Sequence, residues 1–372
     1  MSVRKTRRKR RALALWAALC TLLSGCTDQF GFLPYARELE ETALMQTMGV
    51  DAAGTGAVRV TASTAVPLDG DKPLVVGETA GTISGACLSM QAQGASYIFY
   101  GHVGQILLGE ELGRRDIGPV LDYVLRDVEM RLETKLYLVQ GDTAAGMIEQ
   151  AAQEGSAPER LEAMEADGGL LSQSMTRTVE EVLEDLEENG CTYVPALRTG
   201  EEGDMTAAGY GLIKDGRLVG WAQGEAASGV NLLMGAVDAD IIEVDLPQGG
   251  RAALRLVGAK SRVEPVWEGA RLTGVAIRCK VEANLAEGSR TDLSQADVRG
   301  ELEKRLEYRT GQRIQAAADL CREYGGDFFQ MENRAGWSAP LNWTRLQEQW
   351  EIGELPVTVE VQAHIRRGYD AV

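Results

Sequence analysis

The chain has 372 residues and a formal net charge of −17, from 38 Lys and Arg against 55 Asp and Glu. So strong an acidic balance argues against non-specific binding to nucleic acid or to anionic lipid. Its length suits two or three domains of ordinary size, and its 44% hydrophobic content is typical of globular proteins.

The first 26 residues have the pattern of a lipoprotein leader. Seven Lys and Arg residues precede an apolar run over Ala12–Leu23, which is shorter than the roughly 20 residues that span a membrane. This order is typical of a secretory signal peptide, and Leu23-Ser24-Gly25-Cys26 resembles the bacterial lipobox. We therefore predict a signal peptide at 1–25, a covalent diacylglyceryl lipid on Cys26 and a tether over 26–36. The alternative is an ordinary signal peptide with a chance cysteine.

The leader also sets the charge and the predicted location of the mature chain. Removing its seven basic residues, with no Asp or Glu among them, leaves a net charge of −24. Two acyl chains on Cys26 make a stable anchor. We expect the protein on the outer face of the cytoplasmic membrane, with its acidic body held away from the lipid.

Four other cysteines of the mature chain are far apart in the sequence, and no C-x-x-C pair occurs; they are Cys87, Cys191, Cys279 and Cys321. Disulfides are permitted outside the cell, so their pairing stays open. Buried single thiols are the preferred interpretation.

An N-terminal α+β domain is predicted over 37–195. Apolar runs and alternation predict strands at 45–50, 58–62, 97–100, 105–108 and 136–139. Helical spacing predicts helices near 39–44, at 83–93, after Pro119, after a cap at 142–143, and at 178–188. Loops are expected at 67–82 and 151–169, where polar residues and Gly cluster.

A linker is predicted at 196–207, where Pro, Gly and charge occur without periodicity. The following region, 208–372, is expected to be α+β, with a possible division into two subdomains near 240–250. Lys214-Asp215-Gly216 between apolar runs indicates a hairpin. Further strands are predicted at 241–246, 252–259, 272–285 and 355–365, with a long helix at 295–324. The grouped strands favour a multi-domain α+β fold with mixed or antiparallel sheets flanked by helices.

Catalytic motifs are missing from the sequence. Its two histidines, His102 and His364, are far apart, and no nucleophile elbow, phosphate loop or dinucleotide fingerprint occurs. We therefore predict no enzyme activity, no metal and no cofactor other than the lipid. A hydrolase that uses carboxylates is a weaker alternative.

A dense cluster of mixed charge is the one candidate binding patch; it consists of Arg126, Asp127, Glu129 and Arg131. Such a cluster is typical of a structural ion-pair network. It could also dock a partner subunit.

Several blocks of the mature chain resemble one family. Residues 100–112 resemble its "FGH…IGEELA" segment, residues 121–132 its "LDF-LRDPEIRL" and residues 214–221 its "DKLVGWL". The closing residues 365–368 resemble "KIRRTG". In the block at 121–132, Val128 stands where the family has Pro, which leaves the turn at that position in doubt. The family is that of the Ger(x)C lipoproteins, the C subunits of spore germinant receptors.

This resemblance implies a receptor that responds to small nutrients during spore germination. Its partners would be a membrane-embedded A-type subunit and a transporter-like B-type subunit. The first hypothesis is therefore a lipid-anchored, non-enzymatic subunit that supports assembly or signalling of these partners. The alternative is an extracytoplasmic solute-binding lipoprotein that captures the nutrient directly.

Overall fold

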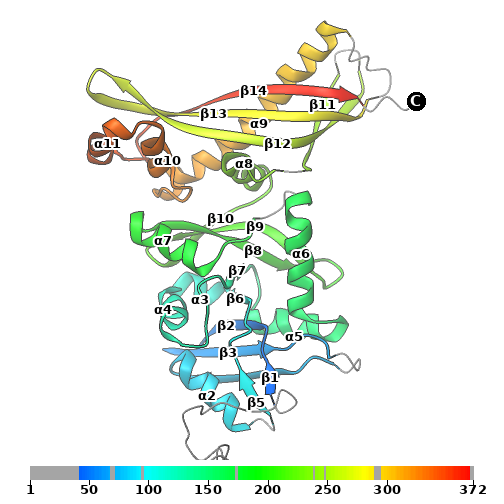
Figure 1. The fold of residues 1–372 in the computed structure, drawn as a ribbon, viewed down its shortest axis with the longest axis vertical. Helices are drawn as coiled ribbons and strands as arrows, with labels where there is room; N and C mark the ends of the chain where they lie inside the picture. Colours follow the sequence, from blue (N-terminus) through cyan, green and yellow to red (C-terminus); the bar gives the residue numbers. More distant parts are fainter. Residues whose placement is uncertain are drawn as a thin grey trace, which may run out of the picture. The chain divides into compact units, whose positions relative to one another are not determined.

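The computed structural model describes residues 42–67, 72–93, 96–171, 175–237, 239–246, 249–288 and 295–368. The predicted signal peptide, Cys26 and the tether lie outside the described residues. The described strands form sheets of eight, four and two strands, and helices pack against the larger two (Figure 1). The predicted class, multi-domain α+β with mixed and antiparallel sheets flanked by helices, is confirmed.

The eight-stranded sheet has a parallel centre and antiparallel ends. Its order is β10-β9-β8-β7-β6-β2-β3-β4, and β2, β6, β7 and β8 run parallel. The strands are β2 (Thr47–Ala53), β3 (Ala57–Ser63), β4 (Val75–Ala80), β6 (Gln105–Gly109), β7 (Lys135–Val139), β8 (Cys191–Thr199), β9 (Met205–Lys214) and β10 (Arg217–Ala222).

Helices cover both faces of this sheet. On β6, Ile106 and Leu108 face one apolar cluster and Leu107 faces the other, as the alternation of side chains along a strand requires. The first cluster includes residues of α2 (Ile83–Gln93), α3 (Glu110–Arg115), α4 (Gly118–Arg126) and α7 (Val179–Asn189). The second includes residues of α5 (Ala144–Glu154) and α6 (Ala157–Leu171). Burial on both faces explains why the central strands are continuous apolar runs.

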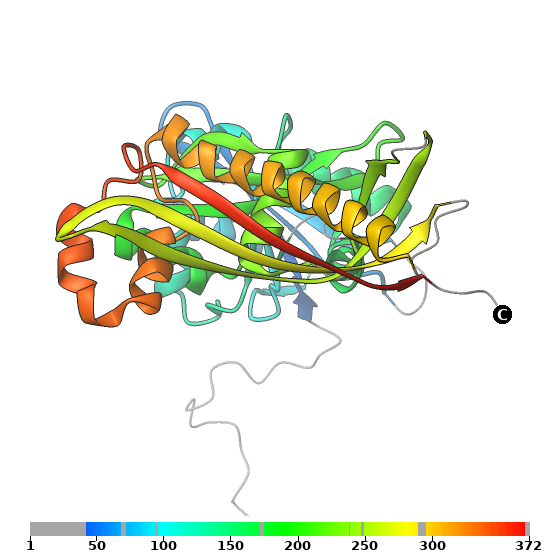
Figure 2. The same cartoon turned by 90° about the horizontal axis from the view of Figure 1, so that it is seen from above.

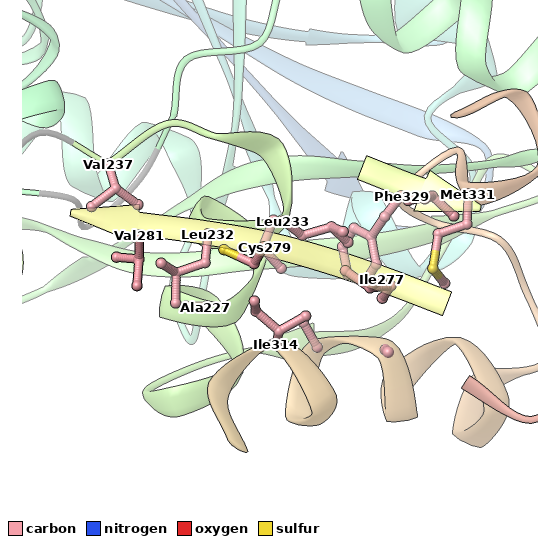
Figure 3. Packing of buried hydrophobic residues seen from close by; sticks show 14 of the residues in the cluster. Ala227, Leu232, Leu233, Val237, Ile277, Cys279, Val281, Ile314, Phe329 and Met331 are labelled. Atoms are coloured by element: carbon pink, nitrogen blue, oxygen red, sulfur yellow. The ribbon is translucent and has the colours of Figure 1, made fainter. Parts of the chain in front are cut away.

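The four-stranded sheet follows in the chain. Its order is β11 (Ile241–Asp245), β12 (Arg251–Glu268), β13 (Arg271–Glu287) and β14 (Val357–Gly368), and β14 is parallel to β13. It packs on α8 (Glu225–Met234) and α9 (Ala296–Tyr324), and on the short α10 (Met331–Ser338) and α11 (Trp343–Gln349). Figure 3 shows Leu232 and Leu233 of α8 beside Cys279 of β13, with Ile314 of α9 below.

Among the described strands, β14 is the last of its sheet, and helix α9 packs along part of its outer edge. Helix and strand lie side by side in Figure 2. Glu307 accepts the Ala363 N–H at 3.1 Å and Glu303 accepts the Ile365 N–H at 2.9 Å. Bare strand edges pair with other chains, so these two glutamates close part of an edge that would otherwise be open.

Most predicted elements are confirmed. The helix at 83–93 is α2, the long helix at 295–324 is α9, and Thr143 caps α5 by accepting the Gly146 N–H at 3.0 Å. The hairpin at 214–217 also forms, with Asp215 at φ 48° and Gly216 at φ 74°. Two positive φ values are what a type I′ hairpin turn requires.

Three local predictions were wrong. The loop predicted at 67–82 contains β4, and the one at 151–169 contains most of α6. The helix predicted near 39–44 is absent from its described part, because β1 (Thr42–Leu44) pairs with β5 (Tyr97–Phe99). Leu161 is buried against the sheet, and this burial stabilises α6 as a helix despite the Gly-rich sequence that follows.

The linker predicted at 196–207 also differs from the structure. Ala196 and Leu197 are buried in β8, and β9 already begins at Met205, so only 200–204 form a turn. Leu197 pairs with Ala207 across the resulting hairpin. The charged residues that suggested a linker belong to this turn. The chain changes from one large sheet to the other later, between Ala222 and Ile241.

The cysteine prediction is confirmed for the thiols that the structure describes. Cys87, Cys191, Cys279 and Cys321 are all unpaired and buried. In the described residues, no helix is both long and apolar enough to cross a membrane.

Candidate functional site

The charged cluster predicted from the sequence follows the end of α4. Arg126 donates to Asp122 one helical turn earlier, at 2.6 Å. Glu129 accepts the Tyr100 N–H at 3.0 Å, and Arg131 donates to the Gly101 carbonyl at 2.6 Å. Glu129 and Arg131 therefore fasten the end of α4 to the turn that joins β5 and β6. Their contacts are those of a structural brace, and a docking role of the four residues stays a prediction.

The turn around Val128, where the family has Pro, is stabilised by the side chain of the preceding residue. The Asp127 carboxylate accepts the Glu129 N–H at 2.9 Å, which is the bond of an Asx turn. Val128 itself is 98% exposed, and Leu125 on the preceding helical turn is 55% exposed. Two exposed apolar side chains thus flank the outward-facing Arg126.

A cleft lies directly beside this cluster and is the best candidate for a binding site. It has a volume of about 570 Å³, within the usual range of small-molecule sites. Four segments converge on it: the β2–β3 turn, the start of α2, the end of α3 and one side of α4. Buried side chains of Ile83, Leu112 and Tyr123 form part of its wall.

Charged side chains gather at the mouth of this cleft. They are Arg115, Asp116, Asp122, Arg126 and Asp127. Arg115 makes two interactions: it donates a hydrogen bond to the Gly54 carbonyl at 2.6 Å and forms an ion pair with Glu111. The sequence prediction included Arg126 and Asp127, but not the apolar wall, which comes from segments far apart in the chain.

The wall is backed by a buried polar contact. The Tyr123 hydroxyl lies 3.7 Å from the Cys87 sulfur. Burial raises the pKa of the Cys87 thiol, which keeps the thiol protonated and unreactive. Cys87 therefore serves packing behind the cleft.

The two histidines do not form a catalytic arrangement. His102 lies in the turn after β5 and packs edge-on against Phe99. His364 is on β14, with its Nδ1 3.4 Å from Glu303. Within the described ranges, no group of three or more His, Cys, Asp or Glu side chains is placed to hold a metal ion.

Two buried carboxylates escaped the sequence interpretation. Asp51 on β2 accepts the Ala144 and Ala145 N–H groups at the start of α5, at 2.8 and 2.9 Å. Asp327 accepts the Met331 and Glu332 N–H groups at the start of α10, at 2.8 and 2.7 Å. In the sequence each is a single Asp beside apolar residues. The local pattern does not show which helix start its carboxylate will contact.

Two family descriptions match the chain. "Spore germination protein N-terminal domain" matches residues 35–199, and "Spore germination B3/ GerAC like, C-terminal" matches residues 208–369. The matches cover most of the chain and resume after the β8–β9 turn. The chain belongs to the GerAC-like family of spore germination proteins, as the resemblance in its sequence blocks implied.

A solved structure supports the same fold. The chain resembles the structure described as "Crystal Structure of the GerBC protein", with a TM-score of 0.57 and 17% identity, over 86% of this chain and 96% of that one. Among curated proteins, no sequence matches. At this identity the likeness concerns the fold.

Proposed function

We propose that the protein is the lipid-anchored, non-enzymatic subunit of a nutrient germinant receptor. The family match over both halves of the chain carries this proposal, together with the lipobox at Leu23–Cys26. A diacylglyceryl lipid on Cys26 would hold the protein on the outer face of the spore inner membrane. The acidic body would stand away from the lipid surface.

The partners in this proposal are the membrane-embedded A-type subunit and the transporter-like B-type subunit. The segment around Arg126 is the docking candidate, because Val128 and Leu125 are exposed beside it. Arg126→Glu should weaken association with the partners. Arg322→Glu on α9 is the matched control, because Arg322 is also an exposed arginine that faces an aspartate on its own helix. Equal association of both variants would remove this surface from the proposal.

The direct test is genetic. Deleting the gene should reduce both the germination response and the amounts of the partner subunits in spore membranes. A gene copy with Cys26→Ala should restore neither, because the variant lacks the anchor, whereas a wild-type copy should restore both. A deletion strain with a normal response and normal partner amounts would contradict the proposal.

A second candidate function is direct capture of a small solute, and the cleft beside α4 favours it. Calorimetry with amino acids and sugars, on the full chain in phosphatidylcholine nanodiscs, should then show heat of binding. No heat from any of them would remove this candidate while leaving the receptor-subunit proposal standing.

A further inference from the structure

Two large apolar side chains are exposed where α10 passes into α11. Trp337, in the last turn of α10, is 75% exposed, and Leu341, before the start of α11, is 99% exposed. Tryptophan side chains are highly buried on average. The exposure of Trp337 only four residues from a bare leucine therefore indicates a surface that another molecule covers.

The backbone that carries Trp337 is well packed. The ring of Trp343 lies on Gly336, where a Cβ would come within 1.5 Å of the ring. Ala335 is buried, and its carbonyl accepts the Ala339 N–H at 3.2 Å. These contacts hold the chain on both sides of Trp337, so the exposure of its side chain is not the result of a loose segment.

The same stretch of chain carries no charge. Residues 335–344 contain no Lys, Arg, Asp or Glu, although 25% of the whole chain is charged. The exposed Leu125 and Val128 differ in this respect, because Arg126 and Asp127 lie between them. An uncharged segment with an exposed Trp and Leu suits the interface of a bilayer, where burying charge is costly and the indole ring is favoured. A protein partner would tolerate charge at the rim of its contact.

The predicted lipid anchor keeps this segment close to a bilayer. Residues 27–41 separate Cys26 from the first described strand, and fully extended they reach about 50 Å. The acidic body as a whole is repelled by anionic lipid. A close contact between body and bilayer therefore requires a segment without charge, which residues 335–344 provide.

We infer that residues 337–344 insert into the interfacial layer of the membrane, with Trp337 and Leu341 as the inserted side chains. This inference rests on the lipid anchor of the proposed function and adds a second contact with the same membrane. A lipid on Cys26 alone leaves the body free to rotate on its tether. A second contact fixes the orientation of the body, and with it the face that meets the membrane-embedded partners.

The test places a fluorescent label at position 341 of the lipidated full chain. Leu341→Cys supplies an exposed thiol for bimane, because the four cysteines that the structure describes are buried and Cys26 carries the lipid. Emission is compared between phosphatidylcholine vesicles with and without nitroxide-bearing phosphatidylcholine. The label at 341 should lose at least half of its emission to the nitroxide. Arg322→Cys, at an exposed position that faces Asp319 on α9, is the matched control and should keep its emission.

Flotation of the same vesicles separates this inference from the proposed function. A chain that floats with the vesicles, but whose label at 341 is quenched no more than the label at 322, would overturn the inference and leave the anchor standing. A chain that does not float would contradict the anchor, and the inference would fall with it.

Variants of the labelled chain identify the inserted side chain. Trp337→Ser removes the larger apolar group and should reduce the quenching at position 341 at least twofold. Val128→Ser also removes an exposed apolar side chain, but one next to charged residues, and should leave the quenching unchanged. Thermal unfolding should show that both variants fold like the wild type. Equal quenching in the two variants would show that Trp337 is not inserted and would overturn the inference.

Discussion

At the scale of single residues, Asp51 shows how one side chain ties a strand to a helix. Its two oxygens accept the first two N–H groups of α5, and the side chain is 4% exposed. Burial raises its pKa despite these bonds. A Cβ at the neighbouring Gly109 would collide with the carboxylate, so the glycine of β6 makes room for the aspartate of β2.

Asp51→Ala should therefore lower the free energy of unfolding by about 2–5 kcal/mol, because two buried N–H groups lose their acceptor. Urea unfolding of the purified full chain measures this loss. The control is Asp142→Ala nearby, which removes an exposed carboxylate and should cost under about 1 kcal/mol. Equal losses in both variants would show that Asp51 does not hold α5.

Asp327 adds a pH dependence at the same scale. Burial raises its pKa to about 6 from an ordinary value of 3.8. An acid whose pKa is higher in the folded than in the unfolded state favours folding most below the unfolded value. Its contribution is lost as pH rises through the folded value. Asp327 should thus destabilise the fold progressively between about pH 4 and pH 6.

The comparison variant is Asp327→Asn, whose amide oxygen still accepts a bond from α10 but does not titrate. The stability of the wild type relative to this variant should fall by about 2 kcal/mol from pH 4 to pH 6. Thermal unfolding of both proteins across that range measures the difference. Parallel pH profiles would contradict a raised pKa at Asp327.

At the scale of elements, helices α8 and α9 touch where α8 has a glycine. A Cβ at Gly229 would collide with the Arg313 carbonyl and approach Ala317 on α9. Gly229→Ala should cost about 1–3 kcal/mol of unfolding free energy by forcing the two helices apart. Gly300→Ala, in the open first turns of α9 with nothing near its Cβ, should instead stabilise the protein by up to about 1 kcal/mol. Destabilisation by both variants would mean that close approach is not the cause.

The sequence predicted elements where local pattern and tertiary packing agree. Helix α9 keeps its apolar period along its length and ends at Gly325 in the left-handed conformation, so both signals were visible. Helix α6 and strand β4 were missed, because burial of Leu161 and pairing of Val76 with Ala62 depend on distant segments. The candidate site was predictable only in its charged part. Its apolar wall brings together Ile83 and Leu112. These residues are far apart in the sequence, and no local pattern predicts that they meet.

At the scale of the whole molecule, the central claim is that this chain is a receptor subunit held at the membrane by Cys26. The eight-stranded sheet, with its cleft and the Arg126 segment, would then be available to partners, while the four-stranded sheet has part of its free edge covered by α9. Family membership is shown over both halves of the chain, and assembly with partners is the step that needs measurement.

The most direct measurement is affinity purification of the tagged full chain from detergent-solubilised membranes of sporulating cells, followed by mass spectrometry. The same spectra report the modification on Cys26. The account predicts two polytopic membrane proteins in fixed proportion to the chain, and a diacylglyceryl lipid on Cys26. A chain recovered without such partners under conditions that keep other membrane complexes intact, or with an unmodified Cys26, would contradict it.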